Sequence, residues 1–146
     1  MLPIEPRLVA EILGGTAVLH GSIRSLADLE GVVSRGLPRR ALDACVARIW
    51  RDRRAAERFK FRIVPRATYH RRRLLKAAES ERLERLARIV ALTEKVWVGD
   101  REAARVFLTS PHPLLEGRAP IEVARTELGA RRVEDVLVAL LYGHPA

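Results

Sequence analysis

Apolar side chains recur along this chain at intervals of three and four residues, the spacing of one face of an α-helix. Near the C-terminus the pattern gives a stripe of five positions: Val133, Val136, Leu137, Leu140 and Leu141. A helix with such a stripe packs it against a core. We therefore predict a final helix that Thr126 caps, that buries this stripe in the protein's own core and that stops at Tyr142-Gly143.

The same spacing, together with the prolines and glycines that end helices, predicts helical structure along the whole chain. The expected helices lie at 6–13, 25–35, 38–50, 52–60, 65–76, 79–98, 100–110 and 120–125, ahead of the final one. Residues 61–64 are expected to form a short apolar connector between two of them. The predicted fold class is all-α.

Composition agrees with packed helices, since 48% of residues are hydrophobic and only 5% are aromatic. The single cysteine, Cys45, lies on the apolar face of predicted helix 38–50, so we expect a buried structural thiol. One cysteine forms no internal disulfide, which favours the cytoplasm. The first residues lack a signal-peptide pattern and no apolar run approaches the length of a membrane span, so no membrane partner is expected.

Positive charge is concentrated in one segment. Residues 51–76 hold eleven Lys and Arg against two Asp and Glu, which accounts for the whole net charge of +9. The remaining residues are balanced overall. A focused basic segment predicts a polyanionic partner.

Predicted helices 52–60 and 65–76 have the size and separation of a helix-turn-helix motif, whose second helix enters the major groove of DNA. The candidates for contacts with base edges are Arg66, Thr68, Tyr69 and Arg72. Those for phosphate contacts are Arg58, Arg62, Arg71, Arg73 and Lys76. The alternative is a solvated basic helix, or one that binds an acidic protein surface. Ile63 stands where such a turn often has glycine.

No residue pattern indicates an active site or a bound cofactor. The four histidines are scattered without the paired spacing of metal ligands, and Gly14-Gly15 is not followed by the Lys-Ser/Thr of a phosphate-binding loop. Most carboxylates stand beside arginines on predicted helix surfaces, where ordinary ion pairing is expected. The sequence therefore predicts a protein that is not an enzyme.

Successive blocks of the chain resemble the Xre/MbcA/ParS antitoxins, the partners of RES-domain toxins. The blocks are VAEILGG (9–15), RGLP with ALD (35–43), PRATYHRRR (65–73), ESERLERLARI (79–89) and GDREAARVFL (99–108). The most specific part is SPHPLLEGRAPIEV (110–123) with TELGARRVEDVL (126–137) and YG (142–143). Phe107 departs from the family, which often has Trp there.

The resemblance implies a bifunctional antitoxin without catalytic activity or cofactor. Residues 1–98 would form an Xre-like helix-turn-helix part that binds operator DNA and represses the operon. Residues 99–146 would form a small helical domain that caps a RES toxin, an NAD-consuming or ADP-ribosylating enzyme. A single helix-turn-helix of this size makes few contacts with bases, and such motifs usually bind two-fold operators as dimers. A homodimer is therefore expected. The alternative is a stand-alone helix-turn-helix regulator whose C-terminal part only dimerises.

The end of the chain offers a mechanism of inhibition. The residues after the final helix, Tyr142, Gly143, His144, Pro145 and Ala146, are expected to project as a plug, with a terminal carboxylate suited to a cationic nucleotide cleft. Further toxin contacts are expected from the loop that holds His112, Leu114, Leu115 and Arg118. The alternative for the tail is a frayed terminus.

Overall fold

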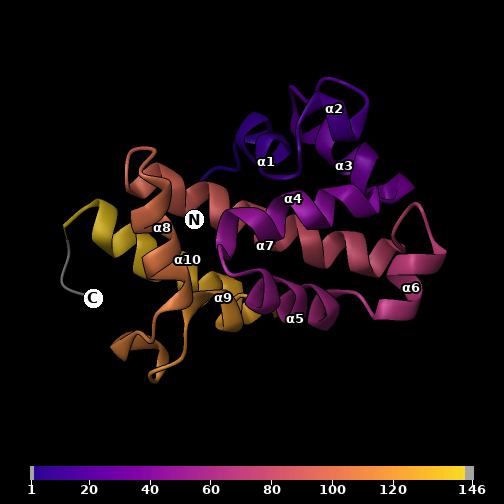
Figure 1. Ribbon diagram of the computed structural model, residues 1–146. Helices are drawn as coiled ribbons and strands as arrows, with labels where there is room; N and C mark the ends of the chain where they lie inside the picture. The colour runs from indigo at the N-terminus through magenta and orange to yellow at the C-terminus, as the bar shows by residue number, and fades with distance from the viewer. Residues whose placement is uncertain (1, 144–146) are drawn as a thin grey trace.

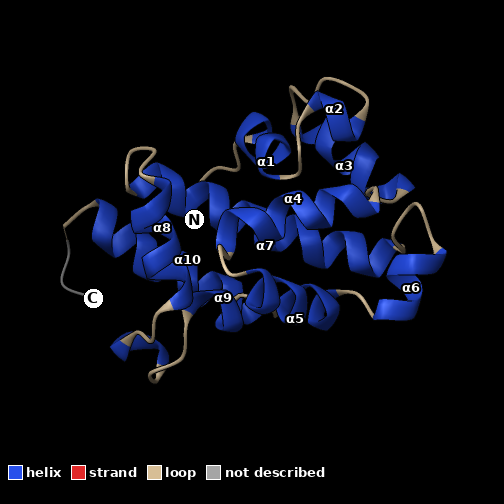
Figure 2. Cartoon of the chain, viewed as in Figure 1, coloured by secondary structure: helices blue, strands red, loops and turns tan. Residues whose placement is uncertain are grey.

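The longest helix, α7 (Ala77–Val96), runs through the middle of the molecule, and other helices pack around it (Figure 1). This computed structural model describes residues 2–143, which form ten α-helices and one 3-10 turn without any β-strand (Figure 2). Before α7 come α1 (Pro6–Ile12), α2 (Thr16–Leu19), α3 (Leu26–Arg35), α4 (Arg39–Ile49), α5 (Arg53–Ile63) and α6 (Arg66–Arg71). After it come α8 (Arg101–Thr109), η1 (Pro113–Leu115), α9 (Pro120–Val123) and α10 (Glu127–Leu141). The predicted all-α class is confirmed.

A single apolar cluster joins the N-terminal and C-terminal helices through α7. It extends from Val9 in α1 to Leu137 in α10, and α7 contributes Leu83, Leu86 and Val90 to it. α7 touches α1, α3, α4, α5, α8 and α10. Cys45 is buried in the same cluster, and burial raises the pKa of its thiol to about 12. A thiol in this state packs as a small apolar side chain.

The region predicted as a helix-turn-helix differs from the expectation in both of its helices. α5 continues to Ile63, so most of the predicted connector is helical and only Val64 and Pro65 separate α5 from α6. Phe59, Ile63 and Val64 are buried, and this packing holds the end of α5 in place. The second helix was predicted over 65–76, but α6 ends at Arg71.

α6 ends early because the residues after it join the corner between α3 and α4. The backbone N–H of Leu75 donates to the Leu37 carbonyl at 2.8 Å, and that of Arg39 donates to the Arg73 carbonyl at 3.0 Å. Gly36 permits this close crossing, because its φ is +101° and a Cβ there would lie 2.6 Å from the Leu75 carbonyl oxygen. The extended crossing therefore takes the place of the predicted second half of the helix.

The apolar stripe of α10 is buried over only part of its length. Val133, Val136 and Leu137 are in the core, as predicted. Leu140 and Leu141 are 45% and 40% exposed, so the prediction that they are buried is wrong. The last turn of α10 projects past the elements that cover the rest of the stripe (Figure 1).

Within residues 2–143, no helix is both long enough and apolar enough to cross a membrane.

Replacing Gly36 with alanine should destabilise the protein by about 1–3 kcal/mol, because the new Cβ meets the Leu75 carbonyl in a backbone conformation that alanine avoids. The control is Gly31→Ala inside α3, where the nearest atom is the mobile tip of Arg35 at 3.3 Å. That substitution should be neutral or stabilising, because alanine favours the helix. Urea denaturation measures both. Equal stability of the two variants would contradict the tight crossing.

Candidate nucleic-acid and toxin interfaces

The crossing after α6 gathers cations from two parts of the sequence into one corner of the molecule. It sets the segment 71–73 beside the first turn of α4, and Lys76 follows at the start of α7. We define the basic corner by its six cations: Arg39, Arg40, Arg71, Arg72, Arg73 and Lys76. None of these six forms an ion pair with another described residue of the chain, and all of them except the half-buried Arg39 are exposed to solvent. That arrangement suits phosphate binding.

Arg39 and Arg40 were not among the residues predicted to bind DNA. They stand more than thirty positions before Arg71, and only the tertiary crossing brings them to it. Arg39 also holds the end of α6, since its Nη1 donates to the Tyr69 carbonyl at 3.2 Å. A guanidinium at a helix C-terminus donates hydrogen bonds to the last carbonyls, which have no partner within the helix.

Polar and aromatic contacts position α6, which buries none of its own residues. The Tyr69 hydroxyl donates to Oδ2 of Asp43 in α4 at 2.6 Å, and Lys60 in α5 donates to the other carboxylate oxygen at 3.1 Å. The Lys60 ammonium also lies 4.3 Å from the centre of the Tyr69 ring. Partial burial, reinforced by Asp43, raises the pKa of Tyr69 to about 12. Tyr69 is thus a scaffold residue, and its hydroxyl is already engaged.

The remaining residues predicted to contact DNA lie outside the basic corner. They differ in whether their side chains are exposed or already engaged within the protein. Arg62 forms a two-pronged pair with Glu122 of α9, at 2.9 and 2.7 Å, so its charge is compensated. Arg66 lies over the Phe61 ring at 4.0 Å from its centre. Thr68 is half-buried, whereas Arg58 is exposed on α5. The structure therefore brings together Arg71, Arg72, Arg73 and Lys76, but not the whole predicted set.

A rigid loop, residues 112–118, lies against α10 in the C-terminal part. An antiparallel bridge joins His112 to Arg118, and Glu116 closes the loop in a left-handed conformation, with φ +55°. The Glu116 carboxylate accepts from Arg132 of α10 at 2.9 and 2.5 Å and from Arg118 at 2.7 Å. These two guanidinium groups lower the pKa of Glu116 to about 2.

The predicted toxin contacts in this loop fall into two groups. Leu115 is completely buried, so it anchors the loop in the core and cannot touch a partner directly. Leu114 and Arg118 are exposed. His112 is half-buried and caps η1, because its Nδ1 accepts from the Leu114 backbone N–H at 3.2 Å.

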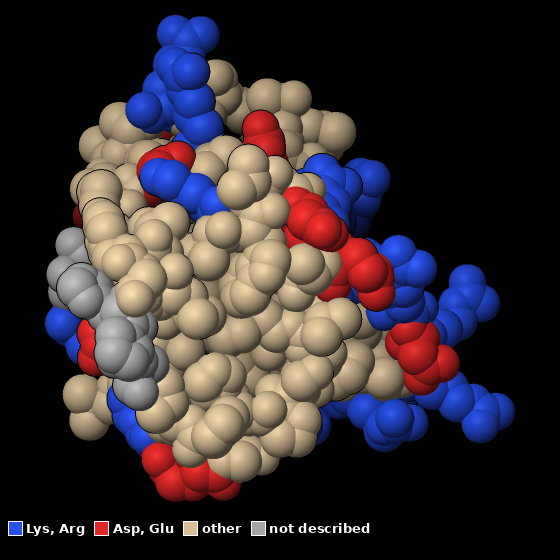
Figure 3. Space-filling view, turned by 90° about the vertical axis from the view of Figure 1, so that its left-hand side faces the viewer, with Lys and Arg blue, Asp and Glu red and all other residues tan. Residues whose placement is uncertain are grey.

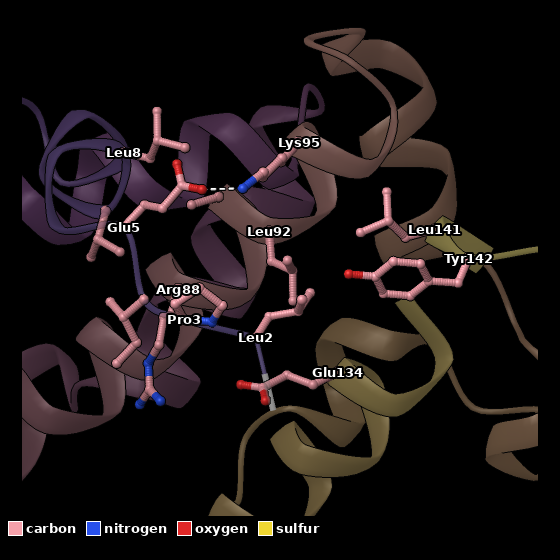
Figure 4. Close-up of a pocket in the computed structure, with 13 residues that line it drawn as sticks. Leu2, Pro3, Glu5, Leu8, Arg88, Leu92, Lys95, Glu134, Leu141 and Tyr142 are labelled. Atoms are coloured by element: carbon pink, nitrogen blue, oxygen red, sulfur yellow. Dashed lines mark hydrogen bonds and ion pairs between the residues drawn. The ribbon is translucent and has the colours of Figure 1, made fainter. Parts of the chain in front are cut away.

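Tyr142, the first residue of the predicted plug, borders a pocket of about 360 Å³ between the N-terminal segment, α7 and α10. Figure 4 shows its ring turned toward Leu2 and Leu92, with an ion pair between Glu5 and Lys95 at another wall. Gly143 follows at the surface. The predicted contacts His144, Pro145 and Ala146 lie outside the described residues.

Metal-ligating side chains do not gather anywhere in residues 2–143, where no group of three His, Cys, Asp or Glu could hold an ion. The polar groups around the pocket belong mainly to ion pairs, such as Glu5 with Lys95 and Arg88 with Glu84.

Residues 92–143 match the family described as the antitoxin Xre/MbcA/ParS C-terminal toxin-binding domain. The matched part begins inside α7 and includes α8, the loop 112–118, α9 and α10. The chain therefore carries a toxin-binding domain of the antitoxin type, which supports a role in a toxin–antitoxin system and indicates a regulator. A search among curated proteins gave no match. The predicted division at residue 98 stays a prediction.

Acidification should release the loop 112–118 only at very low pH. The pKa of Glu116 is lowered from 4.5 to about 2, so its ion pairs stabilise the folded state fully above pH 4.5. That stabilisation is lost as the pH falls from 4.5 toward 2. An NMR titration of the Glu116 carboxyl carbon measures the pKa, and Arg132→Gln should move it back toward 4.5. A midpoint near 4.5 in the unmodified protein would contradict the observed geometry.

Proposed function

We propose that this protein is the antitoxin of a type II toxin–antitoxin system. It acts in the cytoplasm and neutralises a RES-domain toxin, an NAD-consuming or ADP-ribosylating enzyme, by blocking the toxin's active site. It also represses its own operon by binding DNA, and it has neither catalytic activity nor a cofactor. The observation that carries the proposal is the toxin-binding domain at residues 92–143. The same domain argues against a stand-alone regulator whose C-terminal part only dimerises.

The toxin class rests on the sequence blocks that resemble the partners of RES enzymes, of which 110–123 is the most specific. The proposed mechanism is occlusion. α10 ends in an exposed turn, and the segment 142–146 that follows it enters the substrate cleft of the toxin. Helix and loop surfaces of the domain supply most of the contact area, while the tail fills the cleft.

Deleting residues 142–146 should weaken inhibition much more than complex formation. The deletion removes little of the core, because Tyr142 is exposed and Leu137 is the last fully buried residue of α10. The measurement is NAD consumption by the purified toxin, titrated with full-length and truncated antitoxin at matched occupancy. Thermal melting and DNA binding of the truncated form serve as controls. Complete inhibition by the truncated protein at equal occupancy would refute the plug, although not the toxin-binding role.

The proposed repressor activity is supported by the charge and exposure of the basic corner. Its six cations make no ion pairs with described residues, and all of them except Arg39 are exposed. Neutralising phosphates with such groups gives affinity for any duplex, and contacts in the groove add sequence preference. A single corner of this size makes few contacts with bases. We therefore propose that a homodimer reads a two-fold operator.

Replacing Arg71, Arg72 and Arg73 together with alanine should weaken duplex binding on every sequence tested. The slope of log K against log salt should fall by about one for each lost phosphate contact. Arg40→Ala should have a smaller effect of the same kind, which tests whether α4 belongs to the surface. The control is Arg131→Ala, an exposed arginine on α10 paired with Glu127. Fluorescence anisotropy with a labelled duplex measures the affinity of each variant. Unchanged affinity in the folded triple variant would show that the basic corner does not bind DNA.

A further inference from the structure

Three segments of the toxin-binding domain contain no Lys, Arg, Asp or Glu: residues 96–99, 106–115 and 136–143. They belong to the loop before α8, to α8 with the start of the 112–118 loop, and to the end of α10. Figure 3 shows the end of the molecule where α8 and the end of α10 lie, and a wide area of it carries no charged residue. Charged side chains gather at the edges of this area.

Most of the large apolar side chains that the described residues expose are on these three segments. Of nine such side chains, six belong to them: Val98, Val106, Leu114, Leu140, Leu141 and Tyr142. We call the surface that these six residues mark the uncharged face. Exposed apolar patches of this kind, bordered by charged residues, are typical of protein–protein interfaces.

The backbone conformation of Val98 is independent support for a partner contact on this face. Its φ is +53°, a left-handed conformation that disfavours a β-branched side chain, and the side chain is 92% exposed. It therefore contributes no packing to the fold that could offset the strained backbone. Gly or Asn at this position would suit the turn better. A strained, exposed and apolar residue is expected where a partner contacts it.

We propose that the toxin docks on the uncharged face, where Val98 borders the charged rim beside Arg101. This inference rests on the proposed function and specifies its surface. The occupant is the toxin because all six marking residues lie within 92–143, the part that matches the toxin-binding domain. DNA does not fit here, because a duplex requires cations and the basic corner lies near the opposite end of α7.

The position of the face also agrees with occlusion by the tail. Tyr142 belongs to the uncharged face and is the first residue of the segment proposed to enter the toxin's cleft. A toxin that covers Val106 and Leu140 is therefore held beside the point where that segment leaves α10. Its surface opposite the uncharged face should be apolar at the centre and charged at the rim, where Arg101, Glu102 and Arg118 lie.

The test compares three variants with the unmodified protein in calorimetric titrations of the purified cognate RES-domain toxin. Val106→Lys places a charge on the face at a residue that is 57% exposed. Val98→Asn removes the apolar group and relieves the strained backbone. The matched control is Leu128→Lys, which lies in the same domain and is 75% exposed but is outside the three segments.

We expect Val106→Lys and Val98→Asn to weaken toxin binding by about ten-fold or more, and Leu128→Lys to change it by less than about two-fold. Val98→Asn should at the same time raise the melting temperature of the free antitoxin by about 2 °C or more. Stability and toxin affinity then change in opposite directions, which loss of folding cannot produce.

Three results would overturn the inference. If Val106→Lys and Val98→Asn both bind the toxin as tightly as the unmodified protein does, the toxin docks elsewhere. Dissociation of an antitoxin dimer by Val106→Lys in sedimentation, with toxin affinity retained, assigns the face to a contact between copies of this chain. An unmodified protein that fails to bind the toxin overturns the proposed function itself, and the inference with it.

Discussion

Burial of α7 is the interaction on which the rest of the structure depends. Its 20 residues span about 30 Å, and Leu83, Leu86 and Val90 face different neighbours in the one apolar cluster. Helices as short as α1, α2 and α9 are not stable alone in water, so they gain their stability from packing, α1 directly against α7 and the other two against helices that pack on α7. The polar groups that α7 buries have hydrogen-bond partners, as when the Thr93 hydroxyl donates to the Ile89 carbonyl at 2.7 Å.

The two ends of α7 hold the two candidate interfaces apart. At its N-terminal end, Ser80 accepts from the Leu37 backbone N–H at 2.9 Å, which ties the α3–α4 corner to the first turn. At its C-terminal end, Trp97 stacks on Phe107 of α8 with ring centres 5.0 Å apart. One end therefore presents cations and the other an uncharged face, so the proposed DNA and toxin contacts do not compete for the same side chains. The two proposed contacts are therefore compatible with each other.

Local patterns were enough to predict most of the helices and the buried thiol, because amphipathic spacing and helix-ending residues act within a few positions of the chain. The four-residue helix α2 was not predicted. Contacts between distant residues could not be predicted in this way. α6 ends at Arg71 because the next residues bond to Leu37 and Arg39, and nothing near Arg71 in the sequence reveals that crossing. The pairing of Arg62 with Glu122, sixty positions away, likewise could not be predicted from the residues around Arg62.

The error at the end of α10 has a more general reason. An apolar stripe shows that a helix face is buried, but it does not show whether its own domain or a partner buries it. Leu137 and Leu140 are three residues apart on one face, yet the first is in the core and the second is exposed, because the elements that cover α10 end between them. The same pattern therefore gives a core position at Leu137 and an exposed position at Leu140, which belongs to the proposed toxin contact. Where an apolar stripe extends past the core of its own domain, the residues beyond the core are the ones that indicate a binding surface.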